Sequence, residues 1–355
     1  MVLTVEEKVQ IVVWHVNGLS DNMIRQQFVN MFPNRPALAR STIQSIIRNF
    51  FTYGSVFPPR GVRTRRGVNP DLELRDILIC TSIEQNPTQS TSRLGEQYGI
   101  SRFRLMLENG KHVLCEKPFT MNEKQTKKLL DISKEKNLFL MEAVWSRCFP
   151  AYDKMIEVIK SGEIGEVVQV TVEFGVPISH VDRVKNKDLG GGVILDLGVY
   201  ILQFQQYVFN GLKPTKIVAS GHLNEEGIDS SVAAILTFPE GKTAVLSASS
   251  FTKLACEGVV YGTKGCIKMP TFWCPTTLDV NGVVLEFPLI KNEGEFNYLN
   301  SAGLAYEAEE ARQCIMKNKI ESPKITHDNT LELAQLMDKL RAELGVVFPA
   351  DGESY

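Results

Sequence analysis

The sequence lacks several features that would assign it to common protein classes. It has no uninterrupted apolar run of the about 18 residues that a membrane-spanning helix needs. Its seven cysteines are an odd number and contain no C-x-x-C pair, which argues against a disulfide framework and a zinc site. The five histidines form no metal-ligand pattern. We therefore expect no membrane partner and no metal, and a location in the cytoplasm, with the nucleus as an alternative.

The N-terminus also lacks the pattern of a secretory signal peptide. Residues 1–14 carry two glutamates and a lysine before a short apolar run, whereas a signal peptide has a basic start and then an apolar core. With 43% hydrophobic and 23% charged residues, the composition is that of an ordinary globular protein. A chain of 355 residues is long enough for two or three domains.

The net charge of −2 conceals two parts of opposite sign. Residues 1–106 contain 13 Lys and Arg against 8 Asp and Glu, a net charge of +5. This leaves 26 against 33, a net charge of −7, for residues 107–355. A basic first part and an acidic second part suggest that the two parts bind different partners.

The first part is predicted to be helical. Thr4 and Glu7 have the spacing of a capping box at the start of a helix that runs to about residue 17. Ser20 caps a second helix, and Ser41 caps a third with the sequence TIQSIIRNFF. Three short helices with a tight turn before the last are typical of a helix-turn-helix unit, whose last helix enters the major groove of DNA.

The exposed face of the third helix carries side chains that can contact bases or phosphates. These are Arg40, Gln44 and Arg48. A proline- and glycine-containing stretch at 58–67 then has four arginines within seven residues, which suits phosphate contacts or a narrow minor groove. Its arginines are Arg60, Arg63, Arg65 and Arg66.

Further helices are predicted at 71–84 and 88–98, and Ser101 caps the next one. The order of helix-turn-helix, basic linker and TSRLGEQYGISR resembles the paired helix-turn-helix DNA-binding region of mariner-type transposases over residues 1–102. The resemblance implies duplex DNA as a partner of this part. A helical bundle with a solvated basic linker is the alternative interpretation.

From residue 107 the pattern changes to alternating strands and helices. A buried strand at 113–115 is followed by a helix that begins near residue 122 and by a second buried strand at 138–142. This alternation indicates the second half of a doubly wound α/β sheet. We therefore predict a remnant of a Rossmann-like domain at residues 107–150.

Beyond residue 150 the sequence predicts an α+β domain built on an antiparallel sheet, at residues 151–350. Turns at 239–242 and 262–265 and the Asn281-Gly282 pair separate strands in hairpins. Two helices, at about 304–317 and 330–344, finish the chain. We expect about four to six antiparallel strands with helices on one face.

Several motifs in residues 107–350 resemble, in the same order, those of the Gfo/Idh/MocA oxidoreductase family. They are GKHVLCEKP, LFLMEAVWSRCFP, GGGVILDLGVY, GTKG and FWCP. They are most similar to the branch of dimeric dihydrodiol dehydrogenases, which also oxidise D-xylose with NADP. The resemblance implies NADP-dependent oxidation of a dihydrodiol or pentose by a homodimer that pairs through the strand-rich face of the second domain.

The resemblance also implies site residues. Lys117 of the EKP motif and Tyr200 at the end of DLGVY take the catalytic positions, and Asp196 would face the same pocket. A tyrosine can accept the hydroxyl proton if a nearby cation lowers its pKa from about 10. Without the resemblance, the lysine would be read as a solvated turn residue and the tyrosine as part of the core. The cofactor positions are Glu116, Lys117 and Pro118, and the substrate positions are Trp145, Arg147 and Phe174.

One expected motif is missing. Nothing in residues 1–112 fits G-x-G-x-x-G, whose glycines let the backbone approach the pyrophosphate of a dinucleotide at a helix N-terminus. The glycine run at 190–192 precedes DLGVY and belongs to the substrate side. We therefore expect impaired NADP binding and weak or no turnover. Two other hypotheses stay open: a DNA-binding protein that uses the second part for dimerisation, or a chimeric gene model.

Overall fold

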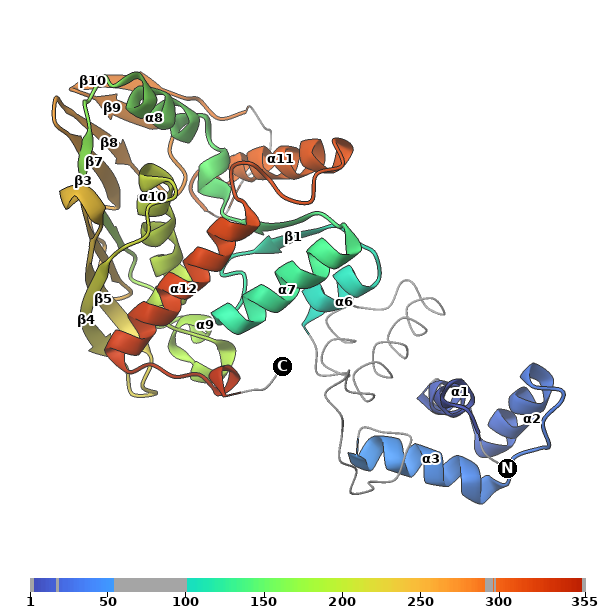
Figure 1. The fold of residues 1–355 in the computed structure, drawn as a ribbon. Helices are drawn as coiled ribbons and strands as arrows, with labels where there is room; N and C mark the ends of the chain where they lie inside the picture. The colour runs from blue at the N-terminus through green and yellow to red at the C-terminus, as the bar shows by residue number, and fades with distance from the viewer. Residues whose placement is uncertain (1–2, 17–18, 54–100, 291–295, 297, 353–355) are drawn as a thin grey trace. The chain divides into compact units, whose positions relative to one another are not determined.

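The computed structural model describes residues 3–16, 19–53, 101–290, 296 and 298–352 (Figure 1). The chain divides into two compact units, Met1–Gly110 and Lys111–Tyr355. The boundary lies close to residue 107, where the sequence pattern changes. The arginine-rich stretch with Arg60, Arg63, Arg65 and Arg66 and the helices predicted at 71–84 and 88–98 lie outside the described residues.

In the first unit, three helices enclose a small apolar core. They are α1 (Val5–Val16), α2 (Asp21–Met31) and α3 (Arg40–Tyr53). The predicted capping box is confirmed, because the Thr4 N–H donates to Glu7 Oε2 at 2.8 Å and the Glu7 N–H donates to Thr4 Oγ1 at 3.2 Å. The core consists mainly of Val9, Ile11, Val12, Val13, Trp14, Ile24, Phe28, Leu38, Ile43 and Ile46.

The connection between α2 and α3 is longer than that of a helix-turn-helix unit. A helix-turn-helix unit joins its helices by a turn of about three or four residues. In this chain, residues 32–39 separate the two helices, so the prediction of a tight turn was wrong. Within this segment Arg35 binds back to α1 with two nitrogens, at 2.6 Å and 3.1 Å from the Glu7 carboxylate. A fourth described helix, α6 (Arg102–Glu108), begins after the predicted cap Ser101.

The second unit begins with a small parallel sheet. Strand β1 (Val113–Glu116) pairs with β2 (Leu140–Ala143), and helix α7 (Glu123–Lys136) connects them. Parallel strands need such a crossover, because a tight turn would make the second strand antiparallel to the first. The strand–helix–strand order at 113–142 is the one that the sequence predicted. Both side chains of β1 that point into the unit, Val113 and Cys115, are buried.

An eight-stranded sheet forms the body of the second unit. Its order is β10-β9-β8-β7-β3-β6-β5-β4, and every neighbouring pair is antiparallel except β3 and β6, which are parallel. The prediction of about four to six strands, all antiparallel, was therefore too low in number and wrong for one pair. The strands are β3 (Val167–Gly175), β4 (Lys216–Leu223), β5 (Asp229–Thr237), β6 (Thr243–Ser249), β7 (Glu257–Gly262), β8 (Cys266–Pro270), β9 (Thr277–Val280) and β10 (Val283–Glu286).

The turns between these strands follow local chemistry. The Asn281-Gly282 pair, with φ of 53° and 88°, joins β9 to β10. Positive φ at both central residues is the requirement of a type I′ hairpin turn, which Asn and Gly meet at the lowest cost. The predicted hairpins at 239–242 and 262–265 are also confirmed, since they join β5 to β6 and β7 to β8.

Helices cover one face of the large sheet, as Figure 1 shows for α10 (Val199–Phe209) and α12 (His327–Leu344). The other helical segments are α8 (Pro150–Ser161), α9 (Asp182–Lys185), α11 (Leu304–Met316) and the short turns η1 (Trp145–Cys148), η2 (Lys187–Leu189), η4 (Pro239–Gly241), η5 (Ser301–Gly303) and η6 (Pro349–Asp351). The core of the unit lies between this helical layer and the sheet. In the described part of the chain, no helix has both the length and the apolar character to cross a membrane.

The DLGVY motif begins on an unusual turn. A π-helical segment, η3 (Ile194–Gly198), leads directly into α10. The carboxylate of Asp229 on β5 accepts the Ile194 N–H at 2.5 Å and so caps this helical start. Only glycine fits at Gly192, because its φ is +114° and a Cβ there would lie 2.6 Å from Asp229 Oδ1. The glycine run therefore lets Asp229 approach and hold the turn that carries Asp196.

Candidate active site

The end of strand β1 brings Lys117 to the π turn. The Lys117 amine Nζ donates to the backbone carbonyl of Asp196 at 2.8 Å and lies 3.3 Å from Asp196 Oδ1. It also lies 4.7 Å from the centre of the Tyr200 ring. The structure thus brings together the three residues to which the sequence assigned catalysis, although 79 positions separate Lys117 from Asp196.

Asp196 has a second basic partner that the sequence analysis missed. Nη1 of Arg183, on α9, donates to Asp196 Oδ1 at 2.5 Å. The Arg183 side chain is 61% exposed, whereas that of Asp196 is mostly buried. Arg183 belongs to a polar loop without helical or strand periodicity, so no pattern in the sequence pointed to it. One carboxylate is therefore shared between a buried amine and a surface guanidinium.

Aromatic side chains surround Tyr200. The Trp145 indole Nε1 donates to the Tyr200 hydroxyl at 3.0 Å. The ring of Phe174 meets the Tyr200 ring edge-on, with 5.5 Å between ring centres, and stacks on Trp273 at 4.6 Å. Trp145 and Phe174, both predicted to bind substrate, therefore contact Tyr200 and fix the orientation of its ring.

Burial controls the protonation of these groups. It lowers the pKa of Lys117 below its usual range, and the nearby Asp196 carboxylate opposes this effect. It raises the pKa of Tyr200 well above its usual value, against the hydrogen bond from Trp145. The Lys117 amine lies over the face of the Tyr200 ring, and burial is the largest cause of the raised Tyr200 pKa.

A buried acid fixes the turn that follows Lys117. The Glu142 carboxylate, on β2, accepts the Phe119 N–H at 3.1 Å. Burial raises the pKa of Glu142 to about 7. Glu116 and Pro118, the other predicted cofactor residues, stand on either side of Lys117 at the carboxyl end of β1, where ligands of parallel sheets bind.

Arg147 is placed differently from the other predicted site residues. It is 1% exposed, and its guanidinium donates to Gln203 Oε1 at 3.1 Å, to the Gln203 carbonyl at 3.0 Å and to Gln206 Oε1 at 2.6 Å. Nη1 lies 3.3 Å from Asn329 Oδ1 at the start of α12. Its donors thus connect η1 to α10 and α12, so we assign Arg147 a structural role in place of substrate contact.

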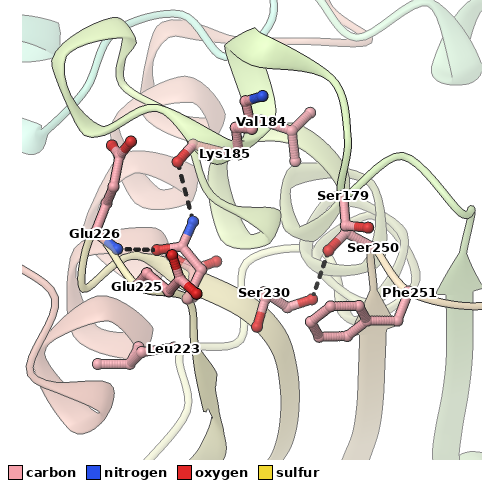
Figure 2. Close-up of a pocket in the computed structure, with 11 residues that line it drawn as sticks. Ser179, Val184, Lys185, Leu223, Glu225, Glu226, Ser230, Ser250 and Phe251 are labelled. Carbon is pink, nitrogen blue, oxygen red and sulfur yellow. Dashed lines mark hydrogen bonds between the residues drawn. The ribbon is translucent and has the colours of Figure 1, made fainter.

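A surface pocket of about 460 Å³ lies elsewhere in the second unit (Figure 2). It is formed where β4 and β5 meet the segment around α9, and neither Lys117, Asp196 nor Tyr200 lines it. Protein contacts already occupy much of its polar lining: the Ser250 hydroxyl donates to the Ser230 carbonyl at 2.9 Å, and Glu226 accepts the Lys187 N–H at 2.7 Å. We therefore place the candidate active site at Lys117 and not at this pocket.

The residues predicted to contact DNA are only partly described. On α3, Arg40 Nε and Gln44 Nε2 both donate to Asp21 Oδ2, at 2.9 Å and 3.0 Å, and Arg48 is exposed. The Asp21 carboxylate offsets the positive charge that would attract a phosphate. DNA binding by this unit stays a prediction.

Comparison with known proteins agrees with the motifs of the second unit. Two family models match: the NAD-binding Rossmann fold of the oxidoreductase family over residues 86–144, and the GFO/IDH/MocA C-terminal domain over residues 152–268. The trans-1,2-dihydrobenzene-1,2-diol dehydrogenase of Xenopus laevis is 41% identical over 246 residues, which cover 69% of this chain and 74% of the relative. The chain belongs to the Gfo/Idh/MocA oxidoreductase family.

A further relative and two solved structures are also similar to this chain. The human trans-1,2-dihydrobenzene-1,2-diol dehydrogenase is 35% identical over 272 residues, covering 76% of this chain and 81% of the relative. An aldose-aldose oxidoreductase of Caulobacter crescentus, solved with glycerol, shares the fold with a TM-score of 0.58 and 19% identity, over 72% of this chain and 86% of that one. A 3-ketoreductase of Actinomadura kijaniata, solved with NADP, gives a TM-score of 0.58 and 22% identity, over 68% and 73%.

The structural role of Arg147 can be tested by Arg147→Met. The change leaves the carbonyl and amide oxygens of Gln203, Gln206 and Asn329 buried without their donor, so we expect a loss of about 3–5 kcal/mol in the free energy of unfolding. Urea denaturation measures it. As a control, Arg183→Met removes an arginine that is largely exposed and should cost about 1 kcal/mol or less. An unchanged stability of Arg147→Met would contradict the structural role.

Proposed function

We propose that this oxidoreductase oxidises a hydroxyl group of a dihydrodiol or of a pentose such as D-xylose, with NADP as the hydride acceptor. The observation that carries the proposal is the buried Lys117 amine, which lies between the Asp196 carboxylate and the Tyr200 ring at the end of β1. The names of the relatives, which share 35–41% identity with this chain, support the class of substrate.

Each residue has a defined part in the proposed reaction. In the proposed reaction the deprotonated Lys117 amine, whose pKa burial lowers, accepts the proton of the substrate hydroxyl. The resulting ammonium is stabilised by the Asp196 carboxylate. The Tyr200 oxygen accepts from Trp145, so its own O–H proton is available to a substrate oxygen. Bound NADP supplies the nicotinamide ring that takes the hydride.

The chain has residues for one end of the cofactor, the nicotinamide end. Glu116, Lys117 and Pro118 form the turn beyond β1 that would hold the nicotinamide ribose. The sequence of residues 1–112 has no G-x-G-x-x-G to let the backbone approach the pyrophosphate. We therefore propose that NADP binds weakly, because only the nicotinamide half of its contacts is present.

Turnover by the purified chain tests the activity. We expect NADP reduction with D-xylose or a dihydrodiol, at a rate that keeps rising at NADP concentrations above about 1 mM, the upper end of usual KM values. The measurement is NADPH absorbance against NADP concentration. A KM in the low micromolar range would contradict weak NADP binding. No turnover at any NADP concentration would contradict the function itself.

The role of Lys117 predicts a specific pH dependence. A base must be deprotonated, so kcat/KM should rise with pH through the pKa of Lys117, which lies below its usual value of 10.5. Lys117→Met should lower kcat/KM about 10²–10⁴-fold and should abolish its rise with pH. Tyr200→Phe is the comparison, since it removes a hydrogen-bond donor and should keep the pH profile. If kcat/KM of the Tyr200→Phe variant no longer rose with pH, Tyr200 would be the base in place of Lys117.

We also propose that the chain forms a homodimer through the face of the large sheet that, among the described residues, carries no helix. Three apolar side chains form a row across β4, β5 and β6 on that face, since Val218 pairs with Ile235 and Ile235 with Val245. They are 49%, 49% and 39% exposed. A solvent-exposed apolar row on an uncovered sheet face is typical of an interface.

The dimer is tested by Ile235→Lys. The lysine places a charge at the centre of the apolar row, so we expect a shift from dimer to monomer in analytical ultracentrifugation. Lys268→Glu, on strand β8 away from this row, is a control that should keep the dimer. A wild-type chain that sediments as a monomer at all concentrations would rule out the dimer.

A further inference from the structure

Arg183 is a surface residue that contacts a buried carboxylate of the candidate site. Its Nη1 donates to Asp196 Oδ1 at 2.5 Å, and the same oxygen lies 3.3 Å from the Lys117 amine. The Arg183 side chain is 61% exposed, whereas those of Asp196 and Lys117 are 12% and 16% exposed. Two cations, one exposed and one largely buried, therefore share a single negative charge.

The backbone that carries Arg183 is fixed by hydrogen bonds to two other segments. Helix α9 has only four residues, so its own hydrogen bonds do little to hold it. The Val184 carbonyl accepts the Gly192 N–H at 2.8 Å, just before the π turn. The Lys185 carbonyl accepts from Asn224 Nδ2 at 3.0 Å, in the connection between β4 and β5 (Figure 2). The position of Arg183 is thus set before its side chain reaches the carboxylate.

The contact between Lys117 and Asp196 has an unfavourable side for a base. A carboxylate next to an amine stabilises the protonated ammonium, which cannot accept the proton of a substrate hydroxyl. Asp196 and Glu116 both act on Lys117 in this direction, whereas the positive charge of Arg183 acts in the opposite direction. A second cation on the shared oxygen therefore favours the deprotonated amine.

We infer that Arg183 is a positioning residue for proton transfer: it binds Asp196 Oδ1 and so limits how strongly that carboxylate holds a proton on the Lys117 amine. The inference rests on the proposed function, in which Lys117 accepts the hydroxyl proton. Arg183 acts through Asp196 and is not itself a proton acceptor, because a guanidinium stays protonated in proteins. The contact is made through Nη1, so it depends on the charge more than on the forked geometry of the guanidinium.

The alternative is that Arg183 only supports the loop, and a neighbouring residue provides the matched control. Lys185, on the same short helix, pairs with Asp182 at 3.0 Å and not with Asp196. Lys185→Met therefore removes a surface cation from α9 and leaves the shared carboxylate with both of its partners. Arg183→Met removes one of those partners, and both variants should fold, since exposed ion pairs contribute little to stability.

Several other groups also influence the protonation of Lys117. The charged and titratable groups around it are Glu116 on β1, Glu142 on β2, Arg183 on α9, Asp196 on η3 and Tyr200 on α10. Burial raises the pKa of Glu142 to about 7, so its charge changes within the range of a pH profile. Because every group except Arg183 is kept in Arg183→Met, the difference between this variant and the wild type reports on Arg183.

The first experiment is the pH profile of kcat/KM for Arg183→Met. Loss of the guanidinium stabilises the ammonium form of Lys117, so the rise of kcat/KM should move upwards by about 0.5–1 pH unit and reach the wild-type plateau at high pH. Below the rise, this shift is a loss of about 3–10-fold. Arg183→Lys keeps the charge and should keep the wild-type profile, as should Lys185→Met. A loss by the same factor at every pH, or an unshifted profile, would overturn the inference.

The second experiment measures Lys117 without substrate or cofactor. The full chain is acetylated with acetic anhydride at a series of pH values, and mass spectrometry gives the extent of reaction at Lys117. Because only a deprotonated amine reacts, the midpoint of the labelling curve should rise by about 0.5–1 pH unit in Arg183→Met and should not move in Lys185→Met. A midpoint that is the same in Arg183→Met and the wild type would contradict the role of Arg183.

The outcomes for this inference and for the proposed function are separable. A labelling midpoint that depends on Arg183, in a chain that reduces no NADP, would support the effect of Arg183 on Lys117 and refute the dehydrogenase activity. NADP reduction with the same pH profile in wild type and Arg183→Met would support the activity and refute the role of Arg183.

Discussion

The contact between Lys117 and Asp196 is the interaction on which the candidate site depends. It joins the carboxyl end of the small parallel sheet to the π turn before α10, across 79 positions of sequence. Each side is held by a buried carboxylate: Glu142 fixes the turn after Lys117, and Asp229 caps the turn that carries Asp196. Misplacing either would separate the Lys117 amine from the Asp196 carboxylate.

Desolvation decides the chemistry of the groups around this contact. It moves the pKa of the Lys117 amine downwards and those of Tyr200 and Glu142 upwards. Each of these shifts favours the neutral form, as expected in a medium of low dielectric constant.

Arg147 shows the other way in which a buried charge is tolerated. Its guanidinium is surrounded by amide and carbonyl oxygens of α10 and α12, so hydrogen bonds replace the lost hydration. Lys117 has fewer partners and lies at an edge of the sheet, where a ligand can approach. Arg147 and Lys117 thus differ in the number of side-chain donors that the protein itself satisfies.

The sequence by itself determined the local features: the capping box at Thr4, the Asn281-Gly282 turn, the strand that ends at Lys117 and the motifs that indicate the oxidoreductase family. These depend on neighbouring residues, so a short window contains their cause. Only the tertiary structure decided the parallel pairing of β3 with β6, the burial of Arg147 and the partnership of Arg183 with Asp196. These depend on distant segments and on desolvation, and neither is visible in the order of residues along the chain.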